Sequence, residues 1–130
     1  MTTVHPLRRV ALLCGLAVLA APAIAQDAYP SKPITIVVGY PPGGSTDLTA
    51  RTVATELGNK LGVPVVIENL GGAGGAIGAQ KVANAAPDGY TLLVGANNEI
   101  AINKLVTKKV KYDLKDFTAI GLIASQPLVL

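Results

Sequence analysis

The sequence predicts an α/β fold in which a mostly parallel sheet is flanked by helices. Three uninterrupted apolar runs are typical of strands that are covered on both faces. A turn rich in glycine or asparagine follows each run, and a stretch with apolar residues at helical spacing follows each turn. This alternation of strand and helix is the pattern of parallel sheets joined by right-handed crossovers.

The first strand is predicted at 34–39, where β-branched apolar residues dominate. The Pro-Pro-Gly-Gly turn that follows cannot extend the strand, because proline donates no ladder hydrogen bond. We predict a helix over 46–61, with N-cap oxygens from Ser45 and Thr46. Gly62 ends this helix, because glycine readily adopts the left-handed conformation found at helix C-termini.

Two further strand–turn–helix units follow. The predicted strands lie at 63–68 and 90–95, and the predicted helices at 75–86 and 99–105. Asn98 is the predicted N-cap of the last helix. The apolar face of the second helix is predicted to consist of Ile77, Val82, Ala83 and Ala86.

The last part of the sequence predicts additional strands at 117–123 and from Leu128 onward. The sequence ends inside this second apolar run, without a terminating signal. We therefore expect the 130 residues to be the N-terminal part of a longer chain.

Residues 1–25 have the organisation of a cleaved secretory signal peptide. Arg8 and Arg9 precede an apolar run over 10–21, and the small-residue triplet at 23–25 supplies the cleavage site. The run is shorter than the roughly 20 apolar residues that span a membrane. We therefore predict export and cleavage, and not a membrane anchor.

The composition of residues 26–130 excludes several kinds of chemistry. The only cysteine and the only histidine, Cys14 and His5, lie in the predicted signal peptide. The exported part can then form no disulfide, no Cys/His zinc site and no Ser-His-Asp or Cys-His unit. Cleavage also removes two of eleven cations and none of eight acids, which leaves a net charge of +1. We predict no catalytic residues, metal, cofactor or nucleic-acid partner.

The three turns near Gly43, Gly74 and Asn97 each follow the carboxyl end of a predicted strand. In a parallel sheet these ends meet at one edge, which is where ligands of such folds bind. Helix N-termini at the same edge present free N–H groups and a positive dipole end, and both attract anions.

The segment Gly43–Thr46 has two open interpretations. It captures an anion through backbone N–H groups, or it is simply a tight turn with a helix cap. It is not a P-loop, because no lysine follows the glycines. We expect Asp47 to face the loop backbone and stabilise the helix dipole, since an outward carboxylate repels an anion.

The segment Gly72–Gly78 offers an alternative function, because it follows a strand and opens a helix as a dinucleotide-binding turn does. Its spacing is G-x-G-x-x-x-G, which differs from the dinucleotide fingerprint by one residue. An exported α/β enzyme or nucleotide-cofactor-binding domain that uses this segment remains the alternative. Asn97, Asn98 and Glu99 either line the same cleft or form an N-cap and a solvated turn.

Six spaced motifs extend along most of 29–130, and their order is more specific than any one of them. They are Tyr29–Ile34, Pro41–Asp47, Leu61–Asn69, Gly72–Gly78, Pro87–Leu93 and Tyr112–Phe117. Together they resemble the start of the substrate-binding proteins of tripartite tricarboxylate transporters, also called the Bug family.

This resemblance implies a periplasmic-binding-protein-like (type II) fold. Residues 26–130 would form part of the first lobe of a two-lobed receptor, without its second lobe. The resemblance also implies a monomer in the periplasm that binds a small carboxylate or related metabolite between its lobes. It implies delivery of that solute to a membrane permease.

By resemblance, the loops around Pro42–Thr46 and Gly74–Gly78 hold the ligand's carboxylate. The candidate ligand-binding residues are Tyr40, Pro42, Gly43, Gly44, Ser45, Thr46, Asp47, Gly74, Gly75, Ile77, Gly78, Asn97 and Asn98.

The sequence departs from the family pattern at three places. Tyr40 stands where phenylalanine is common, Leu70 where arginine is common, and 97–99 where small hydroxyl residues are common. Loss of a cation at position 70 and gain of an acid at position 99 disfavour a strongly anionic tricarboxylate. A monocarboxylate, an amide or an aromatic acid fits these residues at least as well.

Overall fold

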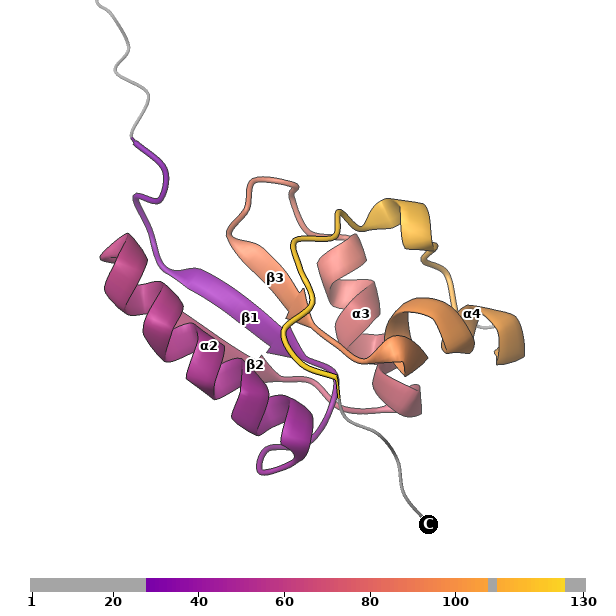
Figure 1. The fold of residues 1–130 in the computed structure, drawn as a ribbon. Coiled ribbons are helices and arrows are strands. Elements are labelled where there is room, and N and C mark those ends of the chain that lie inside the picture. Colours follow the sequence, from indigo (N-terminus) through magenta and orange to yellow (C-terminus); the bar gives the residue numbers. More distant parts are fainter. Residues whose placement is uncertain (1–27, 108–109, 126–130) are drawn as a thin grey trace, which may run out of the picture.

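The structure is a computed structural model that describes residues 28–107 and 110–125 (Figure 1). Its centre is a parallel sheet of β1 (Ile34–Val38), β2 (Val65–Asn69) and β3 (Thr91–Val94), in the order β2-β1-β3. The predicted α/β class with a parallel sheet is thus confirmed. The predicted signal peptide and the strand from Leu128 lie outside the described residues.

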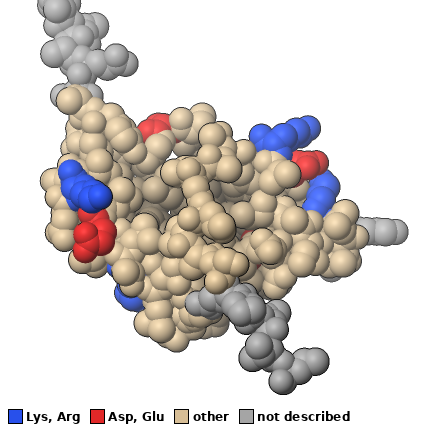
Figure 2. All heavy atoms as spheres, in the orientation of Figure 1, with Lys and Arg blue, Asp and Glu red and all other residues tan. Residues whose placement is uncertain are grey.

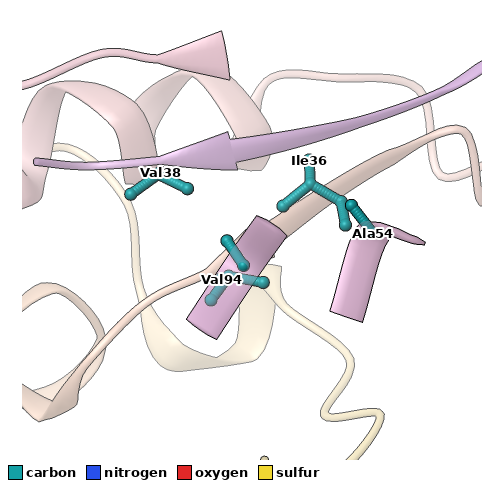
Figure 3. Close-up of a cluster of buried hydrophobic side chains, with 5 residues drawn as sticks. Ile36, Val38, Ala54 and Val94 are labelled. Atoms are coloured by element: carbon teal, nitrogen blue, oxygen red, sulfur yellow. The ribbon is translucent and has the colours of Figure 1, made fainter. Parts of the chain in front are cut away.

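One face of the sheet is covered by α2 (Ser45–Leu61). The register places Ile36 opposite Ile67 of β2 and Leu92 of β3, so these side chains share that face. The core beneath the helix consists of Ile36, Val38, Ala50, Ala54 and Val94 (Figure 3). As predicted, Gly62 ends the helix in the left-handed conformation, with its N–H donating to the Gly58 carbonyl.

The opposite face of the sheet packs against α3 (Ala76–Ala83), which buries Ala76, Gly78 and Ala79. The predicted apolar face is wrong in part: Ile77 is 49% exposed and Ala86 is exposed, whereas Ala83 packs against the buried cluster on this face. The predicted extent is also wrong, since the helix ends at Ala83 and not at 86. At Gly78 a side chain does not fit, because a Cβ there would lie 2.9 Å from the Gly39 Cα, just after β1.

The third helical segment differs from the prediction in its form. A π-helical turn, η2 (Asn98–Ile102), precedes the short α4 (Asn103–Val106). The N-cap is Asn97, and its side chain makes no capping hydrogen bond. The prediction of Asn98 as N-cap is wrong, because the helical turn begins one residue earlier than the pattern indicated.

The predicted strand at 117–123 is also wrong. A short 3-10 helix, η3 (Leu114–Asp116), is closed by a capping box from Asp113, and no strand follows it up to residue 125. Ile120 and Leu122 are exposed. An apolar run forms a strand only when it finds a pairing partner, and the three described strands pair only with one another.

On the face shown in Figure 2, charged side chains lie toward the rim and the middle is uncharged. Within 28–107 and 110–125, no helix has the length and apolar character needed to cross a membrane.

Candidate functional site

Three loops meet at the carboxyl edge of the sheet, as the sequence predicts. We name them the β1 loop (39–44), the glycine loop (70–75) and the β3 loop (95–97). The Leu70 N–H donates to the Val38 carbonyl at 2.8 Å, which holds the glycine loop beside the end of β1. The parallel order β2-β1-β3 places the β1 loop between the other two.

The N-terminus of α2 opens from the β1 loop and has no capping side chain. Its N-cap is Gly44, whose carbonyl accepts from the Leu48 N–H at 3.0 Å. Ser45 and Thr46 are the first two helical residues, so the prediction that they cap the helix is wrong. A capping oxygen must stand one residue before the helix. The N–H groups of the first turn have no intrahelical acceptor, so they remain available as hydrogen-bond donors at this edge.

Asp47 faces the loop backbone, as predicted, and is only 2% exposed. Its Oδ2 accepts from the Gly43 N–H at 2.8 Å and from Arg51 Nε at 2.9 Å, and its Oδ1 accepts from Asn69 Nδ2 at 2.9 Å. The Arg51 hydrogen bond, followed by those from Gly43 and Asn69, lowers the pKa of Asp47 to about 2. The charge of this carboxylate is directed at the protein's own donors.

Asn69 contacts three parts of this edge and was not among the predicted site residues. Its Nδ2 also donates to the Tyr40 carbonyl at 3.1 Å, and its Oδ1 accepts from Arg51 Nη2 at 3.3 Å. The available signal was a pair of polar residues, Glu68 and Asn69, at the end of an apolar run. Through Asn69, β2 fixes both the start of the β1 loop and the first turns of α2.

The glycine loop contains four successive residues with positive φ, at Gly72 (129°), Ala73 (50°), Gly74 (62°) and Gly75 (87°). The last three form the short 3-10 turn η1 (Ala73–Gly75). Asn103 of α4 donates from Nδ2 to the Gly74 carbonyl at 2.8 Å. Asn103, which was not among the predicted site residues, thus ties the loop that follows β2 to the helix that follows β3.

Two of the candidate glycines allow backbones to approach closely. A Cβ on Gly39 would lie 2.9 Å from the Gly75 Cα, and a Cβ on Gly78 would lie 2.9 Å from the Gly39 Cα. Gly75 and Gly78 are both buried. The structure therefore gives these two residues a packing role beneath the exposed part of the loop.

Glu99 is fully buried, which contradicts its prediction as part of a solvated turn. Its Oε2 accepts from the Tyr40 hydroxyl at 3.1 Å and from the Ala96 N–H at 3.0 Å. Burial raises the pKa of Glu99. Burial, followed by the neighbouring Glu99, also raises the pKa of Tyr40.

The candidate residues thus separate into surface and interior groups. Those that are exposed at or near the edge are Pro42, Gly43, Gly44, Ser45, Gly74, Ile77, Asn97 and Asn98. Tyr40 and Thr46 are half-buried, whereas Asp47, Gly75 and Gly78 are buried. The exposed group offers backbone N–H donors, one hydroxyl and two amides, which suit an anionic or polar ligand.

In the part of the chain that the structure describes, no group of three or more His, Cys, Asp or Glu side chains is placed to hold a metal ion.

Sequence comparison gives the chain relatives among transport proteins. Residues 49–130 match the model of the tripartite tricarboxylate transporter family receptor. The protein BugT of Bordetella pertussis is 40% identical over 123 residues, which are 93% of this chain and 37% of BugT. A protein from the TAR-I ttuE-ttuC' intergenic region of Agrobacterium vitis is 41% identical over 95% of this chain and 36% of its own length. The chain thus spans little more than a third of these relatives.

Solved structures of similar proteins agree in fold. MatC from Rhodopseudomonas palustris, solved with bound malate, is 41% identical and has a TM-score of 0.69 over 73% of this chain and 33% of its own. The R. palustris protein Rpa4515, solved with adipate, is 38% identical with a TM-score of 0.64, over 67% of this chain and 29% of its own. The chain therefore belongs to the receptor family of tripartite tricarboxylate transporters, and its fold is that of the corresponding part of a periplasmic binding protein.

Proposed function

We propose that the chain is part of an extracytoplasmic solute receptor whose carboxyl-edge loops hold a carboxylate of a small ligand. One observation carries this proposal above the others. The N-terminus of α2, without a capping side chain, opens at the same sheet edge as an exposed glycine loop. Unpaired N–H groups and a positive dipole end together form an anion-binding arrangement.

The donors for the carboxylate come from two sides. The β1 loop contributes the exposed backbone of Gly44, and the start of α2 contributes the exposed Ser45 hydroxyl. The glycine loop contributes backbone at Gly74, which Asn103 holds in place from behind. Because Asp47 is bound to Gly43, Arg51 and Asn69, its charge is compensated by donors of the protein before a ligand arrives.

The residues at this edge favour a ligand with few negative charges. Leu70, where the family commonly has arginine, is half-buried, and Arg51 is hydrogen-bonded to Asp47. The edge therefore relies on amides and a hydroxyl more than on cations. A monocarboxylate or dicarboxylate needs less charge compensation than a tricarboxylate. The malate and adipate bound to MatC and Rpa4515 are dicarboxylates.

The remaining parts of the proposal concern organisation and partners. Residues 1–25 serve as a cleaved signal peptide, and residues 26–130 form part of the first lobe of a two-lobed, monomeric binding protein. The receptor works in the periplasm and delivers its solute to the permease of a tripartite transporter. Family membership supports this receptor over an exported enzyme or a cofactor-binding domain at Gly72–Gly78.

The proposal is tested by the thermal stability of the full-length protein in the presence of candidate ligands. The panel contains malate, adipate, benzoate, citrate, NAD and ATP. A ligand at 100 times its Kd stabilises the folded state by about 2.7 kcal/mol, which raises Tm. We expect a rise with at least one carboxylate. Stabilisation by nucleotides alone would reject the receptor in favour of the cofactor-binding alternative.

A substitution at the helix N-terminus locates the binding. Ser45 is exposed and makes no capping hydrogen bond, so Ser45→Ala should leave the free protein's Tm unchanged. Loss of a hydrogen bond to a charged group should raise the Kd of the carboxylate about tenfold or more. Thr52→Ala, on the same helix and also exposed, is the matched control and should leave Kd unchanged. Equal Kd values for both variants and the wild type would place the carboxylate elsewhere.

A further inference from the structure

Glu99 is a buried carboxyl group that the proposed carboxylate site does not use. It lies where all three loops meet. Its Oε2 receives the Tyr40 hydroxyl from the β1 loop and the Ala96 N–H from the β3 loop. Its side chain fills the space in front of Gly75 of the glycine loop, because a Cβ there would lie 2.7 Å from the Glu99 Cδ.

The chain segment that carries Glu99 is itself anchored to the glycine loop. Asn103, four residues later, donates to the Gly74 carbonyl, so two side chains one helical turn apart contact successive loop residues. The Tyr112 hydroxyl donates to the Glu99 backbone carbonyl. Glu99 is the second residue of the π-helical turn at Asn98–Ile102, and its side chain is buried.

No described cation compensates Glu99. None of the ion pairs between described residues includes it. The titratable groups that face it are the phenols of Tyr40 and Tyr112, which are neutral donors. The charged side chains on the adjacent helices α3 and α4 are Lys81 and Lys104, and they pair with Glu68 and Asp113 respectively.

The two carboxyl oxygens of Glu99 have different surroundings. Oε2 accepts two hydrogen bonds, whereas Oε1 is buried and accepts none from the described residues. An ionised carboxylate shares its charge between both oxygens, and an oxygen without donors makes that charge costly in the interior. A neutral acid avoids that cost, because its carbonyl oxygen, Oε2, accepts both hydrogen bonds and its hydroxyl oxygen, Oε1, carries no charge.

We propose that Glu99 is the positioning residue of the carboxyl edge, and that it holds the three loops together as a neutral carboxylic acid. In this form it accepts from Tyr40 and Ala96 without bringing a negative charge to the floor of an anion-binding edge. The proposal extends the proposed function to a residue behind the ligand donors. Its test measures stability alone, so its outcome does not depend on whether a carboxylate binds.

The test compares the pH dependence of urea unfolding for the full-length wild type and for Glu99→Gln. A folded-state pKa above the unfolded value of 4.5 means that the folded protein holds the proton longer as the pH rises. The wild type should therefore lose stability relative to Glu99→Gln from about pH 4.5 upward, until the folded-state pKa is passed. The ratio of the two unfolding constants should change by up to about tenfold per pH unit in this window.

The matched control is Glu56→Gln, which neutralises an exposed glutamate on α2. Its ratio to the wild type should stay flat over the same range. A flat ratio for Glu99→Gln, or one that moves in the opposite direction, would overturn the proposal. Failure of Glu99→Gln to fold would also overturn it, because the carboxamide has the shape of the neutral acid and keeps an acceptor for both donors.

A second variant keeps the test decisive without changing Glu99. Tyr40→Phe removes one donor to Oε2, which the ionised form needs more than the neutral form. We therefore compare Tyr40→Phe with the double variant Tyr40→Phe/Glu99→Gln. The pH window over which Tyr40→Phe loses stability relative to the double variant should extend to higher pH than the window of the wild type relative to Glu99→Gln. A window that stays in place or moves to lower pH contradicts the neutral acid.

The positioning role has its own readout in amide hydrogen exchange. Glu99→Gln should preserve the protection of the Ala96 N–H, because the amide oxygen still accepts from it. Glu99→Ala should speed its exchange at least tenfold. Equal exchange in the two variants would show that the acceptor at position 99 does not hold the β3 loop.

Discussion

Asp47 and Glu99 show how the partners of a buried carboxyl group decide its charge. Both lie within the carboxyl edge, and both are almost fully buried. Asp47 receives three donors, one of them the Arg51 guanidinium, and its pKa is about 2. Glu99 receives two neutral donors, and burial dominates to raise its pKa. Two carboxyl groups therefore stabilise the edge in different forms, Asp47 as a charged carboxylate and Glu99 as a neutral acid.

Asp47→Asn should remove part of the acid sensitivity of the fold. Because the folded-state pKa of about 2 lies below the unfolded value of 3.8, the ionised form stabilises the fold above pH 4. That contribution is lost as the pH falls from about 4 to 2. The free energy of unfolding in urea should therefore fall more steeply with decreasing pH for the wild type than for Asp47→Asn. The difference in slope should correspond to the uptake of at most one proton.

The control for this prediction is again Glu56→Gln, an exposed acid on the same helix. Its acid limb should run parallel to that of the wild type. If stability falls between about pH 4 and 2 as steeply in Asp47→Asn as in the wild type, the contacts with Gly43, Arg51 and Asn69 do not stabilise the charged form.

At this scale the sequence predicts Asp47 better than Glu99, for a physical reason. A first-turn acid in an α-helix finds nearby backbone N–H groups in almost any context. The orientation of Glu99 depends on a π-helical turn, which has no distinct residue signal, and on a tertiary contact with Gly75. Asn69 and Asn103 were missed for the same reason, since their partners are distant in sequence.

Among the structural elements, the glycine loop is the one with the least freedom. Four consecutive residues, 72–75, adopt positive φ, and one of them, Ala73, is not glycine. At Gly75 two demands coincide, because its φ is 87° and Glu99 occupies the space of a side chain. At Gly43 only the first demand exists, because its φ is 90° and nothing lies within 4 Å of an added Cβ.

This contrast predicts the relative cost of two substitutions. Gly43→Ala should lower the free energy of unfolding by about 1–2 kcal/mol, the cost of a left-handed non-glycine residue. Gly75→Ala should cost more than Gly43→Ala, because it adds a clash with Glu99 to the same backbone strain. Urea unfolding of the two variants measures the difference. Equal costs would mean that Glu99 does not fill the space in front of Gly75.

The success of sequence prediction differs among the elements. The three strands and α2 were found because their apolar patterns are strong and their ends carry glycine or proline. The buried face of α3 was not found, because a face of Ala76, Gly78 and Ala79 gives almost no hydrophobic period. The run at 117–123 has the composition of a strand, but pairing, which composition does not encode, decides whether a strand forms.

In the whole molecule, the strand order determines which loops form the candidate site. The order β2-β1-β3 brings loops that are distant in sequence to a single edge, and the helices on opposite faces begin there. This convergence was predictable, because it follows from parallel strands alone. The separation of surface donors from buried packing residues was not predictable, since it depends on how closely the loops approach.

The most direct test is a crystal structure of the full-length protein with the carboxylate that raises its Tm most. The account predicts a carboxylate oxygen about 2.7–3.2 Å from backbone N–H groups of 44–46, with Ser45 within hydrogen-bond distance. The glycine loop should face the same ligand. A ligand bound away from the carboxyl edge, or a carboxylate held without any N–H of the α2 N-terminus, would contradict the account.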